Sequence, residues 1–201
     1  MHDNYWNRFL HIEKKLKEFS THVDFDIRNN ETFSIEIMNL YLTICSEIEA
    51  IFKACTSNIS NSFNFRDFRE YYKEETQLQS LSLLKSDVKI KYTSLKFTPF
   101  DKIDSDETIL WWNHHNKIKH DREINRNLAN LKNLLNSASA LFLLNLVYRF
   151  VVQEKIYLIP PPEIFETKDF LVSIHSSGGG LLYTSKACIN SFGAESPFDH
   201  D

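Results

Sequence analysis

The side chains best suited to chemistry are concentrated in one short segment, residues 111–122. It contains three of the eight histidines of the chain, and the groups of interest are His114, His115, Lys117, Lys119, His120 and Arg122. An imidazole with an ordinary pKa of about 6.5 can accept or donate a proton at neutral pH. Lysine and arginine bind anions such as phosphate. This segment is therefore the first candidate for a functional site.

The spacing of these residues limits how they can act together. On a helix, Trp112, Asn116 and His120 lie within roughly 80° of one another and form one stripe. His115 and His120 are roughly 140° apart, so on a straight helix they cannot both contact one small group. They can converge if the helix ends or bends near residue 120, or if a second protomer supplies one of the two rings.

The segment His115-Asn116-Lys117-Ile118-Lys119-His120 resembles the motif of the HEPN superfamily (higher eukaryote and prokaryote nucleotide-binding domain). The family motif is an arginine, four to six residues and then a histidine, often with asparagine directly after the arginine. Asn116 and His120 match this pattern, whereas His115 stands at the position of the arginine. The helices expected over residues 33–153 have the order and lengths of the family, including a long apolar helix after the motif.

The resemblance implies a metal-independent endoribonuclease, or a catalytically inactive relative, in which two protomers bring their motifs together in a cleft. His120 would be the general base toward the RNA 2′-hydroxyl. The charge developing on the phosphate would be stabilised by His115 when protonated, by Lys119 or by Arg122. Asn116 would orient the histidine or the phosphate. Many family members serve in toxin–antitoxin or phage-defence systems.

The partners expected from this resemblance are RNA, a second copy of the chain in a homodimer, and an antitoxin or another defence protein. Lys117 and Lys119 beside the motif are expected to contact RNA. A second set of lysines, on a strand pattern near residues 86–98, offers phosphate contacts through Lys89 and Lys91. The alternative favoured for this second set is a solvated sheet edge that discourages aggregation.

Other interpretations of the histidines also remain open. His114 and His115 fit polar positions on an exposed helix face, and His120 fits a residue that fastens a helix end by bonding a backbone carbonyl. A zinc site built from the three histidines has no support from a His-Glu-x-x-His motif or a pair of cysteines. We therefore expect no metal and no cofactor. The competing function is an inactive module of the same fold that binds protein or RNA.

Composition narrows the class of protein. The chain has 201 residues, of which 42% are hydrophobic, and a net charge of −4, so nucleic-acid binding has to come from a local basic patch. The three cysteines are scattered, which favours a reduced, cytoplasmic setting. No signal pattern begins the sequence. The longest apolar run, residues 141–152, is shorter than the roughly 20 residues of a membrane span, so no membrane association is expected.

The placement of glycine and proline predicts a mainly helical body. All four glycines and four of the five prolines follow residue 159, so the body lacks the turn residues of a β fold. The fold class expected is mainly α, an antiparallel helical bundle over residues 1–154 with a small β-hairpin insertion near residues 86–98. Residues 155–201 are expected to form an extended or β C-terminal appendage on the same domain. Apolar periodicity places the helices at residues 4–20, 33–56, 64–77, a stretch ending near 120, and 127–153. A capping-box pattern at residues 104–107 is expected to begin the fourth of these helices, and Asn127 to cap the last. In the appendage, residues 170–175 and 181–184 fit the two strands of a hairpin.

Overall fold

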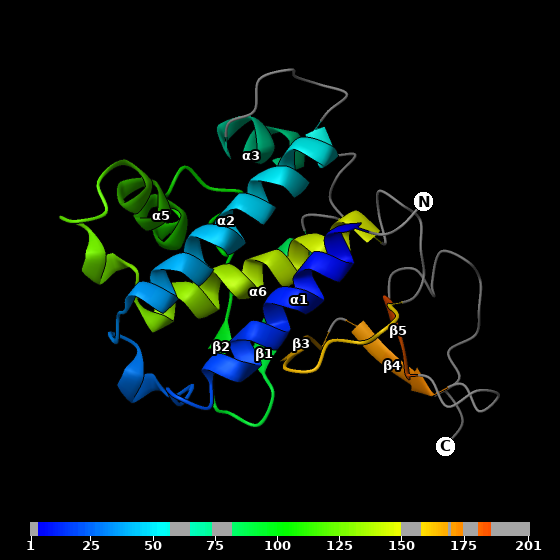
Figure 1. Cartoon of the computed structure of the whole chain (residues 1–201). Helices are drawn as coiled ribbons and strands as arrows, with labels where there is room; N and C mark the ends of the chain where they lie inside the picture. The colour runs from blue at the N-terminus through cyan, green and yellow to red at the C-terminus, as the bar shows by residue number, and fades with distance from the viewer. Residues whose placement is uncertain are drawn as a thin grey trace.

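The computed structural model describes residues 4–56, 65–73, 82–149, 158–168, 170–174 and 181–185. Its helices are α1 (Asn4–Phe19), α2 (Ile35–Thr56), α3 (Phe65–Lys73), α5 (Leu110–His120) and α6 (Leu131–Val147), with short 3₁₀ turns η1 (Ile27–Asn29) and η3 (Arg126–Leu128). The strands are β1 (Val88–Ile90), β2 (Lys96–Phe97), β3 (Phe165–Glu166), β4 (Phe170–Ile174) and β5 (Leu181–Ser185). Figure 1 shows this arrangement, and the prediction of a mainly helical protein with a small β element is confirmed. Within the described ranges, no helix is both long and apolar enough to cross a membrane.

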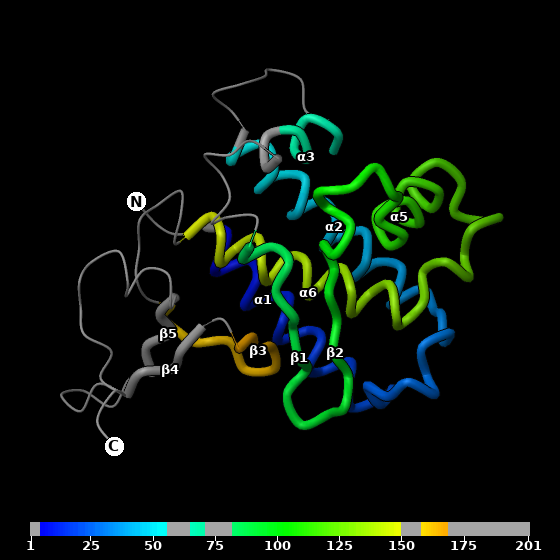
Figure 2. Tube along the Cα trace, turned by 180° about the vertical axis from the view of Figure 1, so that it is seen from behind, coloured from blue at the N-terminus to red at the C-terminus, as the bar shows by residue number. Residues whose placement is uncertain are grey.

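Helix α6 is the centre of the packing. Fifteen of its seventeen residues are buried, and it contacts α1, α2, α5 and β2. Figures 1 and 2 show it running through the bundle with α1 on one side and α5 on the other. Three of its buried polar side chains, Ser137, Ser139 and Asn145, bond to its own backbone, as Asn145 does to the carbonyl of Leu141 at 2.9 Å. A helix that is apolar on every face in this way has to be enclosed by other elements.

Two of the helix starts predicted from the sequence are wrong. The capping-box pattern at residues 104–107 predicts the start of α5, but the helix begins at Leu110 after an extended Ile109 without a side-chain cap. The carboxylate of Glu107 instead pairs with the Lys102 ammonium group at 2.7 Å. Asn127, expected to cap α6, lies in η3.

The actual cap of α6 is Asn130. Its Oδ1 accepts the backbone N–H of Asn133 at 3.0 Å, which satisfies one of the unpaired donors of the first turn. Its Nδ2 donates to Oε2 of Glu31 at 2.9 Å. The backbone also pairs here, because the N–H of Leu131 donates to the carbonyl of Thr32 at 2.9 Å. The start of α6 is therefore joined to the segment that precedes α2.

The hairpin insertion is part of a larger sheet than the sequence predicts. Strands β1 and β2 pair as expected, with Val88 opposite Phe97. Strand β3 pairs antiparallel with the other edge of β1, so the strand order is β2-β1-β3. Phe165 of β3 is fully buried and stacks on Phe142 of α6 with ring centroids 5.8 Å apart. Residues 158–168 thus contribute both a strand and core packing.

Several hydrogen bonds fasten this C-terminal segment to α1, including one from Lys17 to Glu163. The indole Nε1 of Trp6 donates to the carbonyl of Pro160 at 3.0 Å, and the backbone N–H of Ile164 donates to Oε1 of the buried Glu13 at 2.8 Å. Further along the chain, β4 pairs antiparallel with β5, with Val172 opposite Tyr183, as the sequence pattern predicts.

Replacing Asn130 with alanine should lower the free energy of unfolding by about 1–2 kcal/mol, because the cap of the central helix is lost. The matched control is Asn127→Ala, which removes the exposed asparagine that the sequence favours as the cap. That variant should stay within about 0.5 kcal/mol of the wild type. Urea unfolding followed by circular dichroism measures both, and equal losses in the two variants would contradict the assignment of Asn130 as the cap.

Candidate functional site

The first half of α5 is anchored in the core by its two tryptophans. Trp111 is 2% exposed and its Nε1 donates to the carbonyl of Pro99 at 2.8 Å. Trp112 is 8% exposed and stacks on Phe65 of α3 with ring centroids 5.0 Å apart. The sequence predicts one core and one interfacial tryptophan, which is wrong, because α3 covers the second ring. The hydroxyl of Tyr41 on α2 also donates to the Trp111 carbonyl.

The last turn of α5 has exposed side chains at Lys117, Lys119 and His120 around the buried Ile118, and the helix ends at His120. Asp121 caps the helix, and Nδ2 of Asn125 donates to the carbonyls of Lys117 and Asp121 at 3.2 and 2.8 Å. The turn over residues 121–125 is closed by the N–H of Ile124, which donates to Oδ1 of Asp121 at 3.1 Å. The Lys117 carbonyl in the last turn and the carbonyl of the capping Asp121 thus have partners. The turn fixes where the chain continues after His120.

Besides Lys119, three of the predicted site residues are exposed around this helix end: Lys117, His120 and Arg122. Their side chains have no hydrogen bond or ion pair with any other residue in the ranges that the structure describes. Asn116 is half-buried one turn before His120. Lys119 is exposed, but its Nζ is 3.1 Å from Oε1 of Glu49 on α2. These groups can therefore meet an anion from solvent, with Lys119 shared with a carboxylate.

His115, in contrast, points into the core. Its side chain is 3% exposed and lies against the rings of Trp112 and Tyr41, at centroid distances of 5.2 and 6.3 Å. Burial lowers the pKa of His115 to about 4, because a charged imidazolium would lose its hydration there. Its buried Nδ1 has no hydrogen-bond partner in the described part of the chain.

His115 is therefore neutral at physiological pH. The interpretation of His115 as a polar residue on an exposed helix face is wrong, because α2 and Trp112 enclose the ring. A neutral imidazole also cannot supply the positive charge that the family places at this position. Of the three groups that the sequence offers for that charge, Lys119 and Arg122 remain as candidates.

The second set of lysines lies on the sheet, away from α5 (Figures 1 and 2). Nζ of Lys89 pairs with Oε1 of Glu166 on β3 at 3.3 Å. Nζ of Lys91 donates to the carbonyl of Pro162 at 2.8 Å, and partial burial lowers its pKa. Both lysines thus have partners within the fold. The structure groups the residues of α5 and the following turn and does not bring Lys89 and Lys91 to them.

A further histidine, His114, is more firmly positioned than sequence reasoning indicates. The ring is half-buried, and its Nδ1 lies 2.9 Å from Nδ2 of Asn133 on α6. Because these residues belong to different helices separated by a turn and η3, the local pattern contains no signal of this contact. The sequence offers only two interpretations of His114, an exposed polar residue or a zinc ligand, and neither includes a hydrogen bond to α6.

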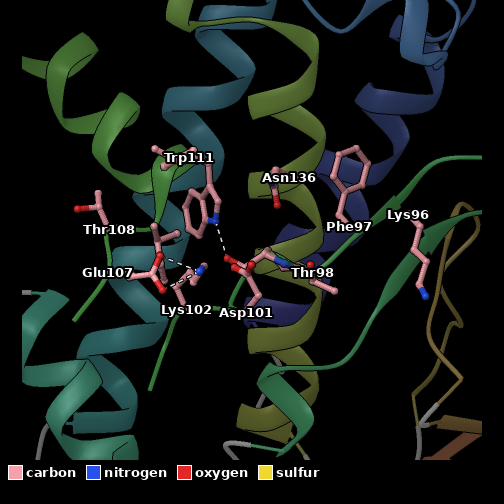
Figure 3. A pocket seen from close by; sticks show the side chains of 12 residues that line it. Lys96, Phe97, Thr98, Asp101, Lys102, Glu107, Thr108, Trp111 and Asn136 are labelled. Carbon is pink, nitrogen blue, oxygen red and sulfur yellow. Dashed lines mark hydrogen bonds and ion pairs between the residues drawn. The ribbon is translucent and has the colours of Figure 1, made fainter. Parts of the chain in front are cut away.

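A pocket of about 550 Å³ lies between three elements: strand β2, helix α6 and the loop that precedes α5. Figure 3 shows Trp111 and Asn136 on its wall, with the ion pair of Lys102 and Glu107 at its edge. Oδ1 of Asn136 is buried and has no partner among the described residues. The sequence does not predict this pocket, because its wall combines a strand, a loop and two helices.

Comparisons with known proteins add no family or relative. No protein-family model, no curated protein and no solved structure matches the chain. Within the residues that the structure describes, no group of three or more histidine, cysteine, aspartate or glutamate side chains is placed to hold a metal ion.

The burial of His115 should make the fold sensitive to acid. The pKa of its ring is about 4 in the folded chain and about 6.5 when unfolded, so between these values only the unfolded chain binds the proton. The free energy of unfolding should therefore fall as the pH drops from about 6.5 to 4, by at most about 3 kcal/mol from this residue. Urea unfolding at several pH values measures the loss. In His115→Gln it should be clearly smaller, and an unchanged pH dependence would contradict the assignment.

Proposed function

We propose that this chain is a HEPN-like protein that acts on RNA as a metal-independent endoribonuclease. The observation that carries the proposal is the exposed end of α5, where Lys117, His120 and Arg122 surround one helix terminus without partners among the described residues. An imidazole beside two cations has the composition needed for proton transfer next to a phosphate. The resemblance of residues 115–120 to the family motif supports RNA as the substrate.

The proposed reaction needs no metal and no water. His120 removes the proton of a ribose 2′-hydroxyl, and the 2′-oxygen attacks the adjacent phosphorus. The bond from phosphorus to the 5′-oxygen breaks, and that oxygen takes up the proton that the His120 imidazolium releases, so that His120 returns to its neutral form. The products are a 2′,3′-cyclic phosphate and a 5′-hydroxyl end.

Arg122 is the residue proposed to stabilise the charge on the phosphate. Lys119 is shared with Glu49, and His115 is neutral, so Arg122 offers the cation with the fewest competing contacts. Its planar guanidinium group presents several donors to phosphate oxygens at once. As in the family, the proposal places the motifs of two protomers in one cleft of a homodimer. A role in a toxin–antitoxin or phage-defence system, with an antitoxin as partner, rests on the family resemblance.

The second candidate is an inactive module of the same fold that binds RNA or protein. One observation favours it specifically. The residue at the family's arginine position, His115, is buried and uncharged, so the motif lacks its fixed charge. In such a module the exposed cations around His120 would bind a partner without transferring a proton.

Replacing His120 with alanine should abolish RNA cleavage. Purified protein incubated with total RNA and EDTA is expected to give fragments with cyclic phosphate ends, and the variant should lose at least about 100-fold in rate without its base. The matched control is His11→Ala, an exposed histidine on α1, which should cleave like the wild type. Cleavage that persists in His120→Ala excludes this residue as the base. The absence of cleavage in the wild type favours the inactive module.

The chain should also form a dimer in solution, because the proposed cleft needs two motifs. Light scattering coupled to size exclusion should give a mass near twice the 23.7 kDa of one chain. A monomer at the concentrations where cleavage is observed would contradict the shared cleft, while leaving the role of His120 to be judged by its own variant.

A further inference from the structure

His114 is held in one orientation and one tautomer by a short hydrogen-bond chain. Nδ2 of Asn133 donates to the carbonyl of Leu128 at 2.8 Å, which fixes the amide nitrogen on that side of the group. The same nitrogen is 2.9 Å from Nδ1 of His114, so its second hydrogen points to the ring. Nδ1 therefore accepts, and the neutral ring carries its proton on Nε2.

Two lysines flank this ring. Lys117 is three residues after His114 on α5 and so lies on the same helix face. Lys132 directly precedes Asn133, the residue that bonds to the ring, in the first turn of α6. Both lysines are exposed, and neither side chain has an ion pair or hydrogen bond to another residue that the structure describes. The two ammonium groups therefore stay available to a ligand from solvent.

The charges around His114 favour an anion. Burial lowers the pKa of the ring, and the charges of Lys117 and Lys132 lower it further, against the opposing effect of Glu31. The carboxylate of Glu31, which acts in the other direction, already has a hydrogen-bond partner, because its Oε2 accepts from Nδ2 of Asn130 at 2.9 Å. Two positive charges thus face one negative charge, beside a neutral ring that acts as a hydrogen-bond donor.

We propose that Nε2–H of His114 and the ammonium groups of Lys117 and Lys132 form a phosphate-binding site where α5 passes the start of α6. The three donors come from two helices, which suits a tetrahedral anion with several acceptor oxygens. The ligand is a phosphate group, either of a small phosphorylated molecule or of a nucleic-acid backbone. The site shares Lys117 with the proposed cleavage site but does not use His120 or Arg122, and its test rests on His114 and Lys132, which have no part in the proposed cleavage reaction.

The test is a titration of the full chain with inorganic phosphate at neutral pH, followed by nitrogen-15 spectra of the imidazoles. The ring of His114 should show the Nε2–H tautomer and should shift as phosphate binds. His114→Gln and Lys132→Gln should each raise the dissociation constant by about tenfold or more, because each removes one donor. If His114→Gln lowers the melting temperature, Lys132→Gln still tests the site, because replacing an exposed lysine should leave the fold intact.

The matched control is Lys15→Gln, which removes the same charge from the exposed face of α1. It should leave the dissociation constant within about twofold of the wild type. An equal weakening in Lys15→Gln and Lys132→Gln would overturn the proposal, because the binding would then follow the total charge alone. Unchanged affinity in His114→Gln, or a ring with its proton on Nδ1, would also overturn it.

A second arm identifies the source of the phosphate. A short all-deoxy oligonucleotide carries phosphodiesters but lacks the 2′-hydroxyl, so its binding is measured without cleavage. Tighter binding of the oligonucleotide than of inorganic phosphate, lost in Lys132→Gln, supports the site and assigns it to a nucleic-acid backbone. Binding of inorganic phosphate alone supports it as a site for small phosphorylated molecules. Binding of neither overturns the site and leaves the result for His120→Ala intact.

Discussion

The nearly complete enclosure of α6 is the constraint on which the rest of the structure depends. A helix with fifteen buried residues of seventeen cannot stand at a surface, so α1, α2, α5 and the sheet have to cover it on different sides. Only Lys132 and Asn136 escape burial, and these residues are four apart, on one face. α5 lies along this face, since His114 bonds Asn133 and Trp111 shares a pocket wall with Asn136. Both unusual polar features of the molecule, the bonded histidine and the pocket, follow from this incomplete cover.

The same packing divides α5 into two functional halves. Trp111 and Trp112 fix the rotation of the helix, and with it His115 turns inward beside them. His120, five residues later, faces solvent at the helix end. The roughly 140° between these two positions decides which ring is neutral and enclosed and which one faces solvent. The two histidines therefore differ in their surroundings because of their positions along the helix.

The sequence predicts the helices well because apolar periodicity reflects burial directly, and the spans of α1 and α2 agree with it closely. Prediction from the sequence fails where the structure around a residue depends on partners that are distant in the chain. Glu107 has the spacing of a capping box but pairs with Lys102 instead. Strand β3 is only two residues long, and its pairing with β1 is invisible in the local pattern. His115 is enclosed by Tyr41 of α2, and no feature of residues 111–122 indicates that contact.

The distribution of charge along α5 bears on how this protein would handle an anion. His114 and His115 both have lowered pKa values because both rings lose hydration, so neither adds positive charge at neutral pH. Positive charge is supplied instead by side chains at the exposed end, Lys117 and Arg122, and by Lys132 across the seam with α6. Exposed lysine and arginine side chains attract phosphate over a distance that depends on the ionic strength. A neutral imidazole with a fixed orientation adds a directional hydrogen bond, which only a correctly placed phosphate oxygen can accept. A chain with a net charge of −4 can therefore hold a phosphate at this seam, provided that the local cations and the oriented ring act on the same group.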